Sequence, residues 1–190
     1  MRVSETMKRG EVRSRMVEAA VSLLATHGLE GTSFAEVLAA TGGPRGSLYH
    51  HFPQGKAELV HAALDLASER GLAAMEASRG KPAVAVVAGY LGLWQALLDR
   101  AQLRAGCAVL AVTVAATEPE LRSHAGEIFR TWTGHLTGLL VDGGLEAGRA
   151  RKLATLLVTT VEGAVAVCRA EGTREPFDIV AEALLQLAEG

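Results

Sequence analysis

The sequence contains few of the residues that bind metals or form cross-links. It has 190 residues but two cysteines, Cys107 and Cys168, which lie far apart and form no Cys-x-x-Cys pair. This spacing argues against a zinc site and a disulfide framework, so both thiols are interpreted as buried structural groups. The six histidines are dispersed except for His50 and His51, and no Ser-His-Asp, Cys-His or paired-carboxylate set can be placed. We therefore expect no metal, no cofactor and no enzymatic centre.

An excess of positive charge and long apolar runs are also missing. The 19 Lys and Arg residues against 21 Asp and Glu give a net charge of −2, which excludes a globally basic nucleic-acid binder but allows a local patch. No uninterrupted apolar run reaches the ~20 residues that span a bilayer. The N-terminal "MRVSETMKRGEVRSR" lacks the apolar core of a signal peptide. These absences predict a soluble cytoplasmic protein without a membrane partner.

Apolar residues are abundant and follow a helical period. Hydrophobic residues make up 49% of the chain and aromatic residues 4%, and no strand-like alternation extends beyond a few residues. The three-four spacing predicts helices over 11–27, 33–40, 44–51 and 56–79, and a final helix after Pro176. Ser33 with Glu36, and Thr117 with Glu120, fit capping boxes at helix starts. The fold is therefore predicted to be all-α.

The stretch "TGGPRGSLYHHFPQGK", residues 41–56, allows three interpretations. As a metal site it is poor, because adjacent helical residues such as His50 and His51 point about 100° apart and no acidic or cysteine cluster is near. As a phosphate-binding loop it lacks a preceding strand and the Gly-Lys-Ser/Thr ending, since Ala57 follows Lys56. Two short helices joined by a glycine turn, a helix-turn-helix, fit the surroundings best.

The second helix of such a motif enters the major groove by its N-terminal end. Pro44 suits the first helical position, Gly46 and Ser47 are small enough for close approach, and Arg45 can bind guanine with two hydrogen bonds. Side chains placed to reach phosphates are Tyr49, His50 and Lys56, with Thr32 and Ser33 at the start of the first helix.

The segment "GTSFAEVLAATGGPRGSLYHHFPQGKAEL" resembles the DNA-binding segment of the TetR family of transcriptional regulators. The usual pattern is Thr-Ser, a short helix, a glycine turn, Gly-x-Leu-Tyr-x-His-Phe and Lys-x-x-Leu, and the match covers roughly 9–66. The matching residues are Leu48, Tyr49, His51, Phe52, Lys56 and Leu59. Gly43 and Pro44 in the turn, and one extra residue in "FPQGK", depart from the common pattern. These departures, with "RAGCAVLAV", "FRTW" and "VEGAVAVCRA", resemble the LmrA/YxaF-like branch.

The resemblance implies two domains and a regulatory function. Residues 9–69 would form a three-helix DNA-binding domain with the helix-turn-helix, and residues 70–190 a larger helical domain for ligand binding and dimerisation. The protein would then be a homodimeric repressor that binds double-stranded DNA and is released from a palindromic operator by a small hydrophobic ligand.

The second half fits these expectations. From Leu153 to Cys168 only Glu162 is charged, which suits a dimer interface in which Gly163, Ala164 and Ala166 allow close helix approach. The central helix of a monomeric domain is the alternative. Candidates for ligand contact are the larger or polar side chains among small aliphatic residues, although each also fits an ordinary core. They are Tyr90, Trp94, Cys107, Phe129, Trp132 and His135.

Two other functions remain as alternatives at this stage. A helical enzyme acting on an apolar molecule lacks a recognisable catalytic set. A helical adaptor or sequestering protein without DNA affinity would leave the motif over 32–56 unexplained. Both hypotheses are weaker than a ligand-responsive DNA-binding regulator.

Overall fold

The structure is a computed structural model that describes residues 9–43 and 45–189. These residues form nine α-helices and no strand, which confirms the all-α prediction. The helices are α1 (Arg9–His27), α2 (Phe34–Thr41), α3 (Arg45–His51), α4 (Lys56–Glu76), α5 (Ala83–Ala101), α6 (Ala108–Ala115), α7 (Pro119–Asp142), α8 (Ala147–Glu171) and α9 (Glu175–Glu189).

Local signals fix the ends of α1 and α2. Gly28 has φ +72° and donates its N–H to Leu24 O at 3.1 Å, so it ends α1 in a left-handed conformation that suits glycine. Ser33 Oγ accepts the Glu36 N–H at 3.1 Å and caps α2 as predicted. Gly42, with φ +68°, ends α2 through its N–H to Leu38 O at 2.8 Å.

Two predicted helix boundaries were wrong. The capping box of Thr117 with Glu120 does not form, because α7 begins at Pro119 and its N-cap is Glu118. Proline is favourable at a first helical position, and the Thr117 hydroxyl donates to the Glu118 carboxylate at 3.2 Å instead. Helix α4 ends at Glu76, before the predicted residue 79, because the chain turns there through a Ser78 N–H to Met75 O hydrogen bond of 3.0 Å.

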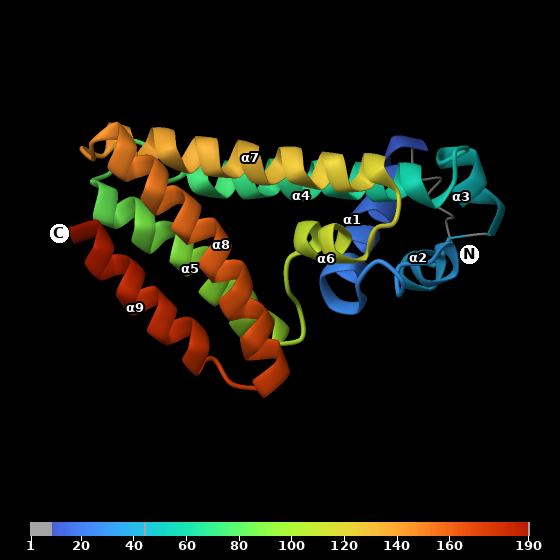
Figure 1. Cartoon of the computed structure of the whole chain (residues 1–190). Helices are drawn as coiled ribbons and strands as arrows, with labels where there is room; N and C mark the ends of the chain where they lie inside the picture. The colour runs from blue at the N-terminus through green and yellow to red at the C-terminus, as the bar shows by residue number, and fades with distance from the viewer. Residues whose placement is uncertain (1–8, 44, 190) are drawn as a thin grey trace, which may run out of the picture.

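Helices α1 to α4 share one core at the end of the molecule where α2 and α3 lie (Figure 1). Arg13 covers the edge of this core with its guanidinium 5.0 Å from the Phe52 ring centroid, and Arg15 donates to Thr41 O at 3.0 Å. The largest fully buried side chains here are Met16, Leu24, Leu48, Phe52, Leu59 and Leu64. The short helices α2 and α3 are therefore held by α1 and α4.

The remaining helices form a larger bundle connected to the first by α4 and α6. Helices α4 and α7 run side by side, and α8 packs against both α7 and α9 (Figure 1). Helix α4 continues across the predicted domain boundary at residues 69 and 70, so the two predicted domains share a helix. By length and composition α8 could cross a bilayer, and half of its most apolar window is buried inside the protein.

Replacing Ser33 with alanine should lower the free energy of unfolding by about 1 kcal/mol, because the Glu36 N–H at the start of α2 loses its partner. Chemical denaturation followed by circular dichroism measures the change. Ser22→Ala is the matched control, since this exposed serine within α1 bonds only the carbonyl of Glu18, at 3.2 Å. We expect it to change stability by less than about 0.5 kcal/mol. Equal losses in the two variants would contradict a capping role for Ser33.

Candidate functional site

The first candidate site is the outer face of α3. Leu48 and Phe52, four residues apart, are fully buried, which turns the intervening Tyr49 and His50 outward. Tyr49 is 69% exposed and rests edge-on against the Phe34 ring, with 5.3 Å between ring centroids. His51 is half-buried. The face thus offers an anchored phenol and an imidazole to an external partner.

The remaining predicted DNA-binding residues differ in their placement. Thr32 is fully buried and its hydroxyl donates to Gly28 O at 2.8 Å. Ser33 caps α2, and Lys56 Nζ donates to Leu29 O at 2.6 Å, so these residues stabilise the segment between α1 and α2. Pro44 lies outside the described residues. Arg45, Gly46 and Ser47 belong to α3, but their side chains lie outside what the structure describes.

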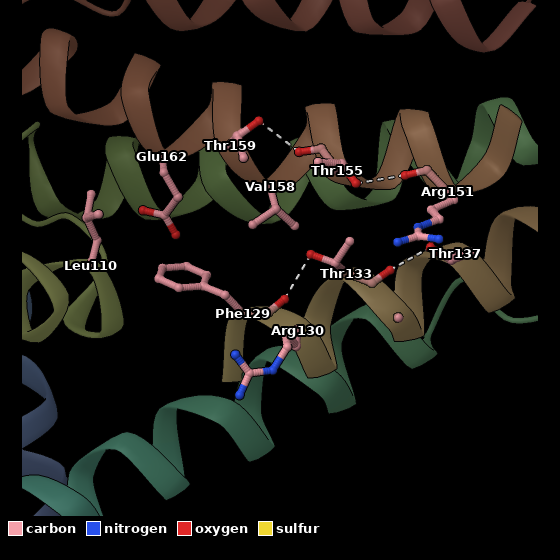
Figure 2. Close-up of a pocket in the computed structure, with 11 residues that line it drawn as sticks. Leu110, Phe129, Arg130, Thr133, Thr137, Arg151, Thr155, Val158, Thr159 and Glu162 are labelled. Atoms are coloured by element: carbon pink, nitrogen blue, oxygen red, sulfur yellow. Dashed lines mark hydrogen bonds between the residues drawn. The ribbon is translucent and has the colours of Figure 1, made fainter. Parts of the chain in front are cut away.

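The second candidate site is a pocket of about 730 Å³ between α6, α7 and α8 (Figure 2). Its threonine hydroxyls already donate to the helix backbone: Thr133 to Phe129 O, and Thr159 to Thr155 O, both at 2.8 Å. The walls include Leu110 from α6, Phe129, Thr133 and Thr137 from α7, and Thr155, Val158, Thr159 and Glu162 from α8. The size and mainly apolar lining suit a drug-sized organic molecule.

A neighbouring pocket of about 520 Å³ lies where the two parts of the protein meet. It is bounded by α1, α6 and α8, and it shares Leu110 and Glu162 with the larger pocket. Beside it, the Gly106 N–H donates to Ala25 O at 2.8 Å and Arg169 donates to Thr26 O at 3.1 Å. A molecule in these pockets therefore touches the elements that hold the end of α1.

Buried polar groups with few or no partners surround the wall shared by the two pockets. Glu162 is 6% exposed, and neither carboxylate oxygen accepts a hydrogen bond from an N–H or O–H group of the described residues. Burial raises its pKa to about 7, while a hydrogen bond from the Cys107 thiol acts in the opposite direction. Burial also raises the pKa of Cys107 and of Tyr90, whose Oη likewise has no described partner. This interior disfavours anions.

The six predicted ligand-contact residues fall in different environments. Phe129 lines the larger pocket and Cys107 the smaller one. Tyr90 is buried in the core and Trp94 is half-buried, both on α5. Trp132 and His135 face α4: the Trp132 indole lies 3.4 Å from Ser68 O, and His135 Nε2 lies 3.0 Å from Glu76.

Sequence reasoning did not select Glu162 or the threonines among the pocket residues. The available signal for Glu162 was its position as the one charged residue between Leu153 and Cys168. The threonines gave no signal, because a helical threonine faces solvent as readily as a pocket.

Two family models match the chain over the two parts described above. Residues 16–63 match the model of the bacterial regulatory proteins of the tetR family. Residues 83–183 match the C-terminal domain of LmrA/YxaF-like transcriptional regulators. The first match covers α3 and its exposed face. The second match covers the whole larger pocket and the part of the smaller pocket that α6 and α8 form, but not the part formed by α1 and the segment after it.

Relatives match over nearly the whole chain. An uncharacterised HTH-type transcriptional regulator from Mycobacterium tuberculosis is 33% identical over 189 residues, covering 92% of this chain and 93% of the relative. The HTH-type transcriptional repressor DhaR from a Mycobacterium species is 26% identical, covering 96% and 97%. The crystal structure of a TetR transcriptional regulator from Chloroflexus aurantiacus has a TM-score of 0.78 at 27% identity, covering 94% of each chain.

Glu162 should make the fold less stable as pH rises. Its pKa is higher in the folded state, about 7, than in an unfolded chain, so its contribution is present below pH ~4.5 and lost as pH rises through about 7. Through Glu162, the free energy of unfolding of the wild type should fall by about 2 to 3 kcal/mol between pH 5 and pH 8. This part of the pH dependence should be absent in Glu162→Gln. Urea denaturation at both values measures this. The exposed Glu171 on the same helix provides the control, Glu171→Gln, which should behave as the wild type. An unchanged pH slope in Glu162→Gln would contradict the shift.

Proposed function

The chain belongs to the TetR family of bacterial transcriptional regulators, and we propose that it is a homodimeric repressor released from a palindromic operator by a small hydrophobic ligand. Its family and relatives are DNA-binding transcriptional regulators and not enzymes. The observation that carries the proposal is the exposed Tyr49 and His50 face of α3 above the buried Leu48 and Phe52. We place the protein in the cytoplasm, where it has access to DNA.

The proposed DNA contact uses α3 as the helix in the major groove. Arg45 would read a base from the N-terminal end, and Tyr49 and His50 would bind phosphates from the exposed face. The contact between Tyr49 and Phe34 supports the role of the phenol, because a ring held in place loses less rotational freedom on binding. Lys56 supports the site indirectly, since its Nζ is bonded to Leu29 O.

The proposed dimer interface lies on α8 and α9. Large apolar side chains are exposed here: Leu156 at 42%, Val167 at 43%, Ile179 at 62% and Leu187 at 51%. The positions on each helix follow helical spacing, so each helix presents one apolar stripe. A second copy would bury these stripes and place two α3 helices on successive major grooves, ~34 to 36 Å apart.

The proposed response to ligand uses the contacts around α6. A ligand at Leu110 and Glu162 touches α6 and α8, and these neighbour the bonds from Gly106 to Ala25 and from Arg169 to Thr26. The end of α1 would shift with them, and α1 packs against both α2 and α4. A ligand that binds the shifted arrangement more tightly lowers the population competent for DNA.

Selection of bound fragments from random DNA should recover an enriched palindrome with two half-sites.

Tyr49→Ala should weaken binding to selected and random DNA alike, because phosphates are the same in every sequence. Arg45→Ala should cost ~1 to 3 kcal/mol on the selected site and relax one position in each half-site. The matched control is Arg100→Ala, an exposed arginine on α5 bonded to Ala96 O. Recovery of no palindrome would oppose the proposed function, and equal losses on both DNAs for Arg45→Ala would remove its role in base reading.

Val167→Glu should convert the dimer to a monomer and reduce operator binding at least about tenfold, since burying an unpaired carboxylate at an interface is unfavourable. Sedimentation velocity at micromolar concentration gives the mass. Val141→Glu is the matched control, because Val141 is comparably exposed, at 40%, but belongs to α7 and not to α8 or α9. A wild-type protein that sediments as a monomer would overturn the dimer.

A further inference from the structure

The carboxylate of Glu162 is a buried acceptor, and the donor beside it among the described residues is the Cys107 thiol, a weak one. The Glu162 side chain is 6% exposed, and neither oxygen accepts a hydrogen bond from an N–H or O–H group of the described residues. Figure 2 shows the carboxylate directed into the space between α8 and α7, at the same end of the pocket as the Phe129 ring. Burying a carboxylate without a strong hydrogen-bond donor lowers the stability of the fold, and a ligand group that donates a hydrogen bond would remove this cost.

The rest of the pocket wall near Glu162 presents acceptors and an aromatic surface. The hydroxyl protons of Thr133, Thr155 and Thr159 are used in bonds to backbone carbonyls one turn earlier, at 2.8, 2.9 and 2.8 Å. Their oxygens keep lone pairs that can accept hydrogen bonds. The Phe129 ring adds the negative face that attracts cations. A ligand group that donates hydrogen bonds or carries positive charge fits this surface.

Two cations of the protein, Arg130 and Arg151, line the same pocket, but neither is paired with Glu162. Arg151 precedes Glu162 by eleven residues on α8, a distance of about 16 Å along the helix. The Arg130 guanidinium lies 4.0 Å from the Glu127 carboxylate on α7. Arg169, in the neighbouring pocket, donates to Thr26 O at 3.1 Å. These three guanidiniums leave the carboxylate for a ligand, and Arg151 disfavours a cation at the opposite end.

We propose that the ligand is an apolar organic ammonium ion whose positive nitrogen binds the Glu162 carboxylate beside Phe129, while its apolar body lies along Val158 and Leu110. This identification of the ligand class rests on the proposed function. The proposed ligand class also gives a reason why ligand binding would alter DNA binding. The ammonium group would lie on the wall shared by the two pockets, next to Cys107 and to the Gly106 N–H that bonds Ala25 O. The tightest contact of the ligand is thus made beside the support of α1.

Three probes of equal length test the proposal: a primary phenylalkylammonium ion, its neutral isostere with a methyl group in place of the ammonium, and the matching phenylalkyl carboxylate. Calorimetric titration of the full chain without DNA should give an affinity for the ammonium ion at least about tenfold above that for the isostere. The carboxylate should bind more weakly than both. In Glu162→Gln, the ammonium ion and the isostere should bind within about twofold of each other. Glu171→Gln, exposed on the same helix, should keep the wild-type preference.

Several results would overturn the proposal. These are equal wild-type affinities for the ammonium ion and its isostere, failure of all three probes to bind at millimolar concentration, or a preference that survives in Glu162→Gln. The comparison of probes in the wild type needs no variant, so it decides the matter even if Glu162→Gln fails to fold. Phe129→Leu gives a second variant, in which the preference should fall without disappearing.

A wrong ligand class and a wrong proposed function would give different results in these experiments. Operator selection is performed without ligand, whereas the probe titration is performed without DNA. An enriched palindrome without ammonium preference overturns the ligand class alone. Ammonium preference without an enriched palindrome supports the site and overturns the DNA-binding repressor.

Discussion

The exposed face of α3 depends on the burial of two side chains beneath it. A seven-residue helix is too short to be stable in isolation, so α3 persists because Leu48 and Phe52 enter the core formed with α1 and α4. The same burial fixes the rotation of the helix, and that rotation turns Tyr49 and His50 outward. Any change that loosens this core removes both the helix and the surface that it presents.

The link between the two parts of the protein is also made by packing. Helix α4 belongs to the N-terminal core at one end and packs along α7 at the other, while α6 contacts α1, α4 and α7. Helices in direct contact pass a displacement of one helix on to the next. At the junction of α4 and α7, His124 lies 2.9 Å from Asp65 and 2.7 Å from His61, so polar contacts reinforce the apolar ones. The two parts are therefore joined by apolar packing through α4 and α6 and by polar contacts between α4 and α7.

The sequence predicted those features that are set locally. Ser33 acts on a residue three positions away, so its cap on α2 could be read directly from the sequence. The capping box predicted at Thr117 was wrong, because α7 begins at Pro119 and proline is favourable at the first helical position. Lys56 could not be placed, since its partner, Leu29 O, lies 27 residues away. The pocket needed three helices to be positioned, which periodicity alone does not do.

Glu162 connects the stability of the fold to the proposed ligand. Its charge is costly in the folded state, and the cost increases as the carboxylate ionises near its pKa of about 7. A ligand that supplies positive charge removes this cost, so its binding free energy includes relief of a penalty already present in the protein. A neutral molecule of the same shape gains the apolar contacts but leaves the carboxylate unpaired. The proposed selectivity for an ammonium ion thus arises from a carboxylate that the fold buries without an N–H or O–H donor, on the wall shared by the two pockets.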